Sequence, residues 1–585
     1  MIREIRLTRI RERSVLISIV FVCVPLILSA FTHLWNPIGF PGIHVDEGTY
    51  MRRAMHVIFY LDPQGSQGSG TYFDHPYFGQ FFLAGILSLF GYPDSLHPST
   101  DVKSIEMLHM APRVLMGLLA VVDTFFVYKI AERRYNNRII GLIAAIIFAV
   151  MPVTWLYRRI LLDSILVPFL LSSILCAIYL KKHDYSAHRS NYYAFHQKEI
   201  GRNGPRTENN SNSNNTNRNT EITTRGDINT TTCGSTILGR RNIVIITLSG
   251  VLLGLAMFTK IPVISMIPIV GFLVFANTNR SFKALGLWFI PVILIPMIWP
   301  AFAVFQGDLD SWLNTVLRQA SRESTGVIGS ITEIMRIDPV FFTIVLIGCI
   351  YASLKRDAML LLWIIPFIVF FTFVAHYINW FHWIPIIPAF SIAAAVMIAD
   401  ASSKVTKKGI IQKVLPLAVI SAIGIFGLTS TVMLITTNLS FFQFQTAAFV
   451  ANHLIADDKS QSNLDKTTVI SSQIYSWIFK YVFREDNIFA TYREGGPIET
   501  GKVILVVDNN FKNYMNQEKP LERDLDRVQR LQTLYNNSTV LNSFEGKTQE
   551  YDRNSYPYYS MKYNFGGTRV QIKEAVGYKE LLQAK

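Results

Sequence analysis

Long stretches without any acidic or basic residue recur along the first 440 residues of this 585-residue chain. A helix needs about 20 mostly apolar residues to cross the hydrocarbon core of a bilayer, so each stretch is a candidate membrane span. With 16% charged residues, 50% hydrophobic residues and a mean hydropathy of +0.28, the composition argues against a wholly soluble protein. The charge-free stretches are 14–45, 75–93, 139–157, 164–180, 242–259, 261–279, 284–307, 339–354, 358–399 and 414–456.

The stretch 75–93 decides the number of spans, because it is short, begins at a His-Pro pair and contains three glycines. We predict that it stays on the far side of the membrane as a juxtamembrane helix. The stretch 358–399 is long enough for two spans, and 114–135 is apolar enough to span around Asp123. The first stretch lacks a cleavage site and is predicted to remain as a span. The chain is then an α-helical polytopic membrane protein with about eleven transmembrane helices.

The basic residues predict the orientation of these spans. The segments expected in the cytoplasm hold 27 Lys and Arg residues, and the short loops on the other side hold about a third as many. This positive-inside pattern predicts an integral, multi-pass protein with a cytoplasmic N-terminus and an extracytoplasmic C-terminus. It also explains most of the net charge of +14, so the charge gives no support to nucleic-acid binding. The cytoplasmic segments are 1–13, 129–138, 181–241, 277–283, 355–357 and 400–413.

The polarity of the chain also predicts its division into units. An Asn-rich insertion has almost nothing to bury and is expected to be disordered in the cytoplasm. In the polar tail, 503–508 is typical of a buried strand and 521–535 of a helix, which predicts a small soluble α/β domain outside the membrane. The predicted units are a transmembrane domain at 1–440, with a first outer loop at 36–112 and the insertion at 183–240, and the α/β domain at 441–585.

Ionisable residues gather at the outer ends of the predicted spans. Charges near lipid are costly and usually face a functional cavity. Each has a plainer interpretation: a solvated loop for the acids, snorkelling for the cations and an interfacial belt for the histidines. Asp123 instead lies within a span, where we predict an interhelical hydrogen bond and no chemistry. The boundary residues are Asp46, Glu47, Asp74, His75, Arg113, Arg158, Arg159, Asp163, Lys260, His376 and His382.

Several of these residues lie in motifs whose order resembles one superfamily. The segments are His44-Val45-Asp46-Glu47-Gly48-Thr49-Tyr50 followed by Ala54, Tyr72-Phe73-Asp74-His75-Pro76-Tyr77, Ala111 to Leu119, Arg158 to Asp163, Phe258-Thr259-Lys260, and Trp383 to Pro388. They resemble the GT-C membrane glycosyltransferases, in the branch of protein O-mannosyltransferases, which use dolichyl-phosphate mannose, and lipid A aminoarabinose transferases. Tyr77 stands where that branch has a second proline. Oligosaccharyltransferases match less well, because the W-W-D-Y-G motif is absent.

The resemblance implies an inverting glycosyltransferase at the outer membrane face. A mannose, or another hexose or pentose, would move from a polyprenyl- or dolichyl-phosphate donor to a hydroxyl of a protein, lipid or glycan. Asp46 and Glu47 would be the catalytic acids, with Asp46 as the base. By the same analogy, Arg113, Arg158, Arg159, Lys260 and His75 would bind the donor phosphate, and Asp74, Asp163, Tyr50, His376 and His382 would position the substrates. Arg113 and His75 could instead brace the two acids.

Three questions stay open at the level of sequence. Asp46, Glu47, Asp74 and His75 offer hard ligands for Mg²⁺ or Mn²⁺, but without a diagnostic spacing. A transporter or flippase of lipid-linked sugars would place its ionisable residues near the middle of the membrane. A non-catalytic glycan-binding relative would leave the function to the tail. The charges at one membrane boundary favour an enzyme over a transporter, and the intact Asp46-Glu47 pair favours an enzyme over a non-catalytic relative.

Overall fold

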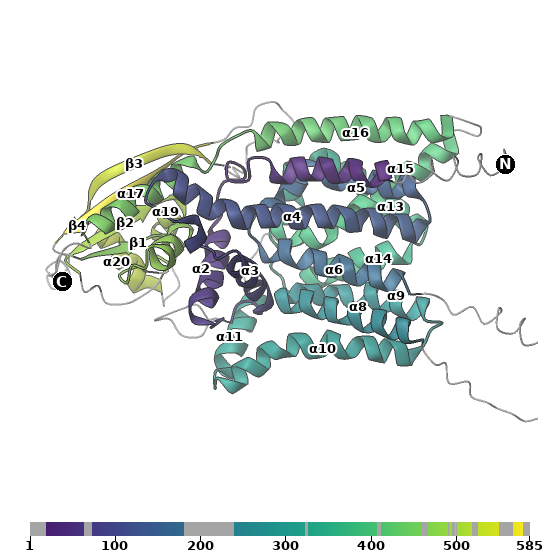
Figure 1. Ribbon diagram of the computed structural model, residues 1–585, viewed down its shortest axis with the longest axis horizontal. Coiled ribbons are helices and arrows are strands. Elements are labelled where there is room, and N and C mark those ends of the chain that lie inside the picture. Colours follow the sequence, from purple (N-terminus) through teal and green to yellow (C-terminus); the bar gives the residue numbers. More distant parts are fainter. Residues whose placement is uncertain are drawn as a thin grey trace, which may run out of the picture.

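The structure is a computed structural model. It describes residues 19–63, 73–180, 239–321, 326–405, 411–457, 466–489, 491–493, 498, 500–517, 524–548 and 566–576. Nearly all of the 183–240 insertion lies outside these residues. Figure 1 shows a bundle of long helices lying side by side, with a small sheet beyond one end.

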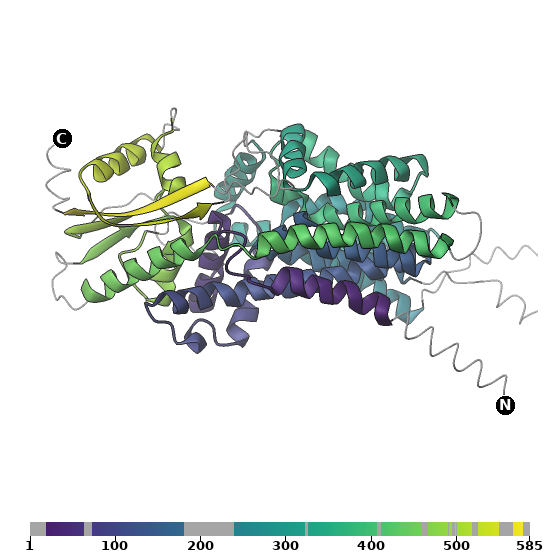
Figure 2. The same cartoon turned by 90° about the horizontal axis from the view of Figure 1, so that it is seen from above.

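The elements of the bundle follow the apolar pattern of the sequence. In chain order they are the helix Ile19–Leu34, α4 (Val102–Tyr135), α5 (Arg138–Val150), η2 (Pro152–Arg158), α6 (Leu162–Ile178), α8 (Arg240–Thr259), η3 (Ile261–Met266), α9 (Ile267–Asn277), α10 (Phe282–Phe305), α13 (Pro339–Leu354), α14 (Ala358–Phe373), η4 (Trp380–Ile386), α15 (Ile387–Val405) and α16 (Ile411–Ile435). Shorter elements, α2 (Val45–Tyr60), α3 (Phe78–Leu89), η1 (Asp94–Leu96), α11 (Leu309–Ala320) and α12 (Gly326–Ile337), connect them. In Figures 1 and 2, α2, α3 and α11 lie where the bundle meets the sheet.

The bundle has the composition of a membrane domain. Within the described residues, five helices are long and apolar enough to cross a bilayer, or up to seven if each of two bent helix pairs is one span. The bent pairs are α5 with η2, at 69°, and α13 with α14, at 118°. The predicted helical architecture, with several helices apolar enough to cross a membrane, is therefore confirmed, whereas the count of eleven stays a prediction. Helix α3 has 12 residues, or about 18 Å, which is too short to cross and supports its juxtamembrane placement.

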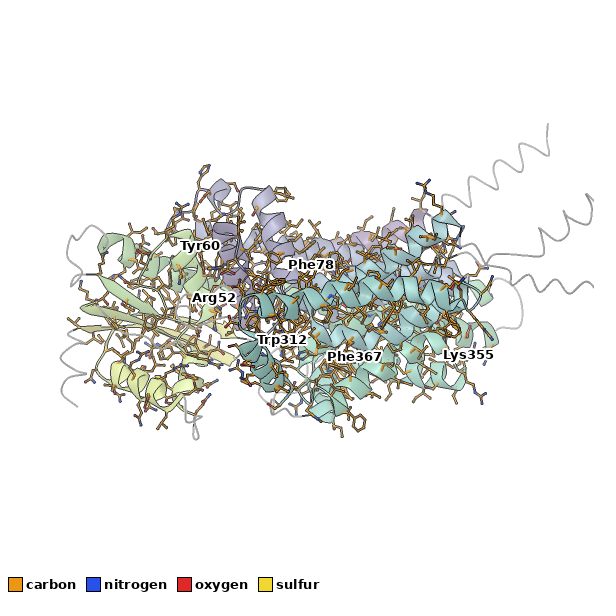
Figure 3. The ribbon with its side chains drawn as sticks, turned by 90° about the horizontal axis from the view of Figure 1, so that it is seen from below. Arg52, Tyr60, Phe78, Trp312, Lys355 and Phe367 are labelled. Carbon is orange, nitrogen blue, oxygen red and sulfur yellow. The ribbon has the colours of Figure 1, made fainter. Side chains whose placement is uncertain are left out.

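Three of the segments expected in the cytoplasm, 129–138, 355–357 and 400–413, meet at the end of the bundle away from the sheet. Arg134 Nη2 lies 3.7 Å from Asp357 Oδ1, and the Tyr135 hydroxyl donates to Asp357 at 2.7 Å. Lys355 forms an ion pair with Asp400. Figure 3 places Lys355 at one end of the molecule and Tyr60 near the other end of the bundle. The two groups of charges that the sequence analysis separated therefore lie at opposite ends.

Asp123 differs from its prediction. Its side chain is fully buried in α4, and neither carboxylate oxygen has a hydrogen-bond partner among the described residues. The expected interhelical bond is made by the next residue instead, since Thr124 Oγ1 donates to Ser29 Oγ at 2.8 Å. The helical position was right, but the polar contact was assigned to the wrong side chain.

The C-terminal residues form a four-stranded sheet flanked by helices. The strands are β1 (Thr467–Ile470), β2 (Lys502–Val507), β3 (Thr539–Thr548) and β4 (Gly566–Val576), in the order β1-β2-β4-β3. Strands β1 and β2 are parallel, and the other pairs are antiparallel. The helices are α17 (Phe441–Asp457), α18 (Gln473–Trp477), the π-helix η5 (Ile478–Val482), α19 (Asn509–Met515) and α20 (Leu525–Asn536).

Strand β2 has the continuous apolar sequence of a strand covered on both faces. Ile504 and Val506 belong to a core shared with α2 and α4, while Val503, Leu505 and Val507 belong to a core shared with α19 and α20. One face of the sheet is thereby packed against the bundle. The domain boundary at residue 440 stays a prediction, but the C-terminal residues are not independent of the bundle.

Candidate active site

A cavity of about 300 Å³ lies at the end of the bundle next to the sheet. Three parts of the chain form its wall. The first outer loop contributes His44, Val45, Asp46, Thr49, Tyr50, Asp74 and His75; the bundle contributes Lys260, Gln319, Tyr377, Asn379, Phe381 and His382; and the C-terminal residues contribute Gln473, Tyr492 and Arg493.

Helix α2 separates the two adjacent acids. His44 caps the helix by accepting from the Asp46 amide at 3.3 Å, and Glu47 accepts in return from the His44 amide at 3.0 Å. Both acids then lie in the first turn, where the helix dipole stabilises negative charge. Because consecutive helical residues point about 100° apart, Asp46 faces the cavity and Glu47 faces the interior.

Glu47 is the centre of a buried ion-pair network. Arg113 donates to both carboxylate oxygens, at 2.8 and 2.9 Å, and Arg159 donates at 2.9 Å. The Ile160 amide donates at 3.2 Å. Burial alone would raise the pKa of Glu47, but the two guanidinium groups outweigh it and hold this pKa at about 2. Glu47 is therefore a permanent anion that anchors α2 to the bundle.

The three predicted phosphate-binding arginines have contacts inside the protein. Arg113 also donates to two loop carbonyls, at 2.8 and 2.9 Å, and Arg158 donates to the carbonyl of Asn36 at 2.9 Å. Arg159 donates to Gly42 O at 2.7 Å, and its guanidinium lies 5.1 Å from the centre of the Trp155 ring. None of the three lines the cavity. Their assignment to the donor phosphate stays a prediction.

The remaining predicted cation does reach the cavity. Lys260 begins the turn after α8, and its ammonium donates to Asp163 at 2.6 Å and lies 4.8 Å from the centre of the Phe381 ring. Asp163 does not line the cavity, so it acts on the cavity only through Lys260.

A second acidic group stands beside Asp46. Asp74 is held by Arg53, whose Nη2 lies 2.8 Å from Oδ1, and His75 Nε2 lies 3.8 Å from Oδ2. Burial lowers the pKa of His75 to about 4, so its imidazole is neutral at neutral pH. Burial, together with the neighbouring carboxylates, raises the pKa of Tyr50 well above its usual value, so this residue presents a neutral phenol.

The two late histidines have different positions. His382 lines the cavity, and its Nδ1 accepts from the Asn379 amide at 2.9 Å. His376 is exposed, adopts a left-handed φ of 51° and does not line the cavity. Of these two histidines, only His382 belongs to the candidate site.

The C-terminal wall was missed by the sequence analysis. Gln473, Tyr492 and Arg493 have no motif, and they lie 427 to 447 residues from Asp46 in the chain. One signal was present: Gly48 follows the acidic pair, and a Cβ there would lie 2.1 Å from the Gln473 carbonyl oxygen. The glycine lets the backbone of α18 lie directly on α2.

The candidate metal ligands do not form a ligand set. Among the described residues, no three His, Cys, Asp or Glu side chains gather closely enough to hold a metal ion. Glu47 and Asp74 are instead paired with arginines. We therefore derive no catalytic step through a metal.

Comparison with known proteins confirms the resemblance found in the motifs. Residues 67–195 match the family described as dolichyl-phosphate-mannose-protein mannosyltransferase. This range contains His75 of the cavity and the arginines bound to Glu47. No curated protein matches the chain.

Solved structures resemble the fold at low sequence identity. The archaeal oligosaccharyltransferase AglB from Archaeoglobus fulgidus, in complex with an inhibitory peptide and a dolichol-phosphate, has a TM-score of 0.51 and 10% identity over 94% of this chain and 75% of that chain. The apo oligosaccharyltransferase of the same organism has a TM-score of 0.50 and 11% identity, covering 88% and 72%. Apo ArnT from Cupriavidus metallidurans has a TM-score of 0.48 and 11% identity, covering 96% and 98%. The first two likenesses show a shared fold.

Proposed function

We propose that this chain, which carries a dolichyl-phosphate-mannose-protein mannosyltransferase segment at residues 67–195, is an inverting glycosyltransferase. It moves a sugar from a polyprenyl- or dolichyl-phosphate donor to a hydroxyl of a protein, lipid or glycan at the outer face of the membrane. One observation carries the proposal: of the two adjacent acids, Asp46 lines a cavity and Glu47 is locked among arginines. The pair supplies one reactive carboxylate on a fixed helix.

Asp46 acts as the general base. Its side chain is one-third exposed and lies 3.7 Å from His44 Nδ1, and burial lowers the pKa of that imidazole. The carboxylate accepts the proton of the acceptor hydroxyl as the oxygen attacks the anomeric carbon. The bond from that carbon to the phosphate oxygen breaks on the opposite face, and the phosphate leaves with the bonding electrons.

Lys260 stabilises the departing phosphate. Its ammonium is the predicted phosphate-binding cation that both lines the cavity and is almost fully buried, where a charge interacts more strongly than in water. Asp163 orients the ammonium. We propose that Arg113, Arg158 and Arg159 serve the reaction indirectly, by fixing α2 and the first outer loop in place.

The other lining residues orient the substrates. Tyr50 offers a neutral hydroxyl beside Asp46, and Asp74 is held by Arg53 where it can accept from sugar hydroxyls. The neutral imidazole of His75 supplies a further hydrogen-bonding position, and His382 supplies another. The sugar is then bound by both hydrogen-bond donors and hydrogen-bond acceptors. A site needs both to discriminate one hexose from another.

The decisive experiment replaces Asp46 by asparagine. Purified protein in nanodiscs is supplied with a panel of radiolabelled polyprenyl-phosphate sugars and with protein, lipid and glycan acceptors. Asp46→Asn should lower transfer by at least about 100-fold, the usual contribution of a general base, with an unchanged melting temperature. Asp310→Asn, which removes a carboxylate from α11, is the control and should keep normal activity. Near-normal transfer by Asp46→Asn would remove this residue as the base.

A further inference from the structure

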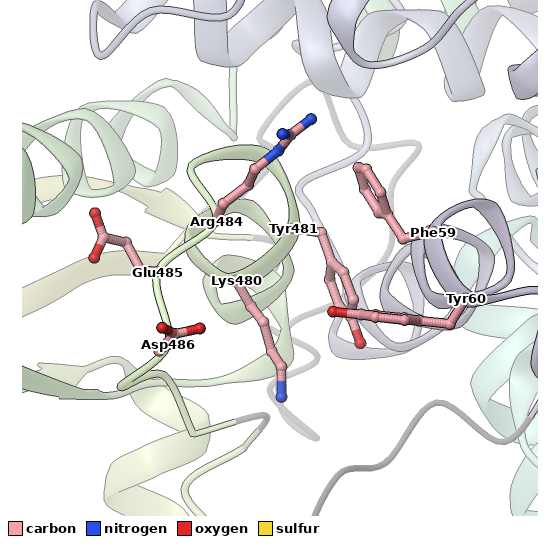
Figure 4. A pocket seen from close by; sticks show the side chains of 7 residues that line it. All are labelled: Phe59, Tyr60, Lys480, Tyr481, Arg484, Glu485 and Asp486. Atoms are coloured by element: carbon pink, nitrogen blue, oxygen red, sulfur yellow. The ribbon is translucent and has the colours of Figure 1, made fainter.

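A second cavity of about 310 Å³ lies between the C-terminal end of α2 and the segment 480–486 (Figure 4). Phe59 and Tyr60 form one wall, and charged residues of the segment form the other. In Figure 4 the Tyr60 side chain crosses that of Tyr481 in the view, and Lys480 extends beside them. The cavity shares no lining residue with the candidate active site.

Two unusual backbone conformations build this cavity. Lys480 and Tyr481 belong to the π-helix η5, a rare form that occurs often at functional sites. Arg484 adopts a left-handed φ of 61°, which costs free energy for a residue with a side chain. Together they turn the chain so that residues one to six positions apart surround one space. Such strain persists only where surrounding contacts hold it.

The aromatic wall is held rigidly. His56 Nδ1 lies 3.1 Å from the Tyr481 hydroxyl, and the Phe59 and Tyr481 rings are stacked with centroids 6.2 Å apart and planes 9° apart. The Arg484 guanidinium lies 5.7 Å from the centre of the Phe59 ring. A ligand would therefore meet a preformed surface and would lose little of its binding free energy to ordering the site.

The charges of the wall balance. Lys480 and Arg484 are opposed by Glu485 and Asp486, so the four formal charges sum to zero. Arg484 also lies 3.6 Å from Asp94. This balance disfavours a polyanion such as a phosphorylated chain. It supplies donors and acceptors on every side of a neutral ligand, and the Tyr60 ring, whose residue is 55% exposed, supplies an apolar surface.

A smaller cavity lies against the same segment. It has a volume of about 110 Å³, shares Arg484, Glu485 and Asp486, and is also lined by Lys466 and Asn487. Two adjacent cavities joined by common residues suit a ligand made of repeated polar units. A single small molecule would fill only one of them.

We propose that the two cavities form a binding site for a neutral oligosaccharide, separate from the catalytic cavity. Asp46 and Tyr60 lie 14 residues apart on α2, which corresponds to about 21 Å along the helix axis. A glycan carried by a substrate would occupy the second site while its reacting group lies at the first. The inference that a substrate carries the glycan rests on the proposed function. The inference that a neutral oligosaccharide binds the second site does not.

The test measures binding to the full-length protein in nanodiscs by saturation-transfer NMR. The probes are neutral oligosaccharides of two to four mannose, glucose or N-acetylglucosamine units, together with uronate oligosaccharides of the same length. At least one neutral probe should bind, with affinity lowered about tenfold by Tyr60→Ala and by Asp486→Asn. Tyr60→Phe, which keeps the ring, should retain affinity within about twofold. Glu545→Gln, an exposed acid on β3, is the matched control for Asp486→Asn and should leave affinity unchanged.

The outcomes separate this proposal from the function. Binding that survives Asp46→Asn but not Tyr60→Ala supports the second site. The proposal is overturned if no neutral probe binds, if binding is lost only in Asp46→Asn, or if the uronate probes bind as tightly as the neutral ones. If the neutral probes bind as expected but no lipid-phosphate sugar is transferred, the result contradicts the proposed function and still supports the oligosaccharide-binding site.

Discussion

At the scale of single residues, the site depends on two neighbouring acids that have different environments. Asp46 is partly exposed in the cavity, and Glu47 is 1% exposed among Arg113 and Arg159. Removing one member of a buried ion pair leaves uncompensated charge in the interior, which costs about 3–5 kcal/mol. Glu47 therefore stabilises the fold around the base.

The pH dependence of stability tests this assignment. The folded pKa of Glu47 is about 2, below its ordinary 4.5, so its stabilisation is complete above pH 4.5 and is lost as the pH falls to 2. The pKa of His75 is lowered to about 4, so stability also falls between pH 6.5 and pH 4 as the unfolded state binds a proton. Chemical denaturation in nanodiscs should show Glu47→Gln to be less stable at pH 7, and its stability should change less than that of the parent below pH 4.5. An unchanged acid dependence would show that Glu47 is not the buried anion.

The sequence predicted which ionisable residues lie at the cavity, but it did not predict their hydrogen-bond and ion-pair partners. Asp46, Asp74, His75, Lys260 and His382 were selected as charges or histidines at span ends, and all of them line the cavity. Position at a boundary is visible in hydropathy, but a guanidinium's partner depends on which distant carboxylate or carbonyl folds against it. The three arginines expected to hold phosphate illustrate this difference.

At the scale of elements, the close contact between α2 and α18 controls the cavity. A Cβ at residue 48 would lie 2.1 Å from the Gln473 carbonyl oxygen, a backbone atom that cannot rotate away. In Gly48→Ala, α18 must therefore shift. We expect a lower melting temperature and a loss of transfer of about tenfold or more, as misplacement of a site by about 1 Å can cost 100-fold.

A second glycine provides the control for that substitution. Gly85 lies in the interior of α3, and a Cβ there would meet nothing within 4 Å. Gly85→Ala should keep activity and keep or slightly raise the melting temperature, because alanine favours the helix. Equal loss in both variants would mean that helix propensity, and not the contact with α18, explains the effect.

The C-terminal wall predicts a role for Arg493 in substrate binding. Its guanidinium lies 5.8 and 5.2 Å from the ring centres of Tyr492 and Tyr514, and the side chain lines the cavity. Arg493→Gln should raise the KM of one substrate several-fold, as expected for loss of one charged hydrogen bond, with an unchanged melting temperature. Arg569→Gln, an exposed arginine on β4, is the matched control. Unchanged kinetics in Arg493→Gln would leave the C-terminal residues as a structural wall only.

Elements with a strong local pattern were predictable. The apolar run at 503–508 predicted β2, and 521–535 predicted α20, which begins at Leu525. The sheet order could not be predicted, because β4 inserts between β2 and β3 through pairings with no local signature. The short elements α18, which lines the catalytic cavity, and η5, which lines the second cavity, also lack a periodic pattern of apolar residues.

At the scale of the whole molecule, the two ends of the bundle predict which end faces the cytoplasm and which faces the outer side of the membrane. Basic residues near Asp357 and Asp400 gather at one end, and the candidate site lies at the other. A protease added outside intact vesicles should therefore cleave the chain after residue 440 and spare the 183–240 insertion. Detection uses tags placed on each segment, and detergent-opened vesicles provide the control. Cleavage of the insertion from outside would contradict the predicted topology.

The packing of the sheet on α2 has a consequence for synthesis of the protein. Asp46 is translated first, whereas Gln473, Tyr492 and Arg493 follow every described helix of the bundle. Chains grow from the N-terminus, so the cavity stays incomplete until Arg493 has been made. A nascent or truncated chain that lacks these residues holds the carboxylate without the wall that positions a substrate beside it. The order of the segments thereby delays a competent site until the whole bundle and the C-terminal wall have been translated.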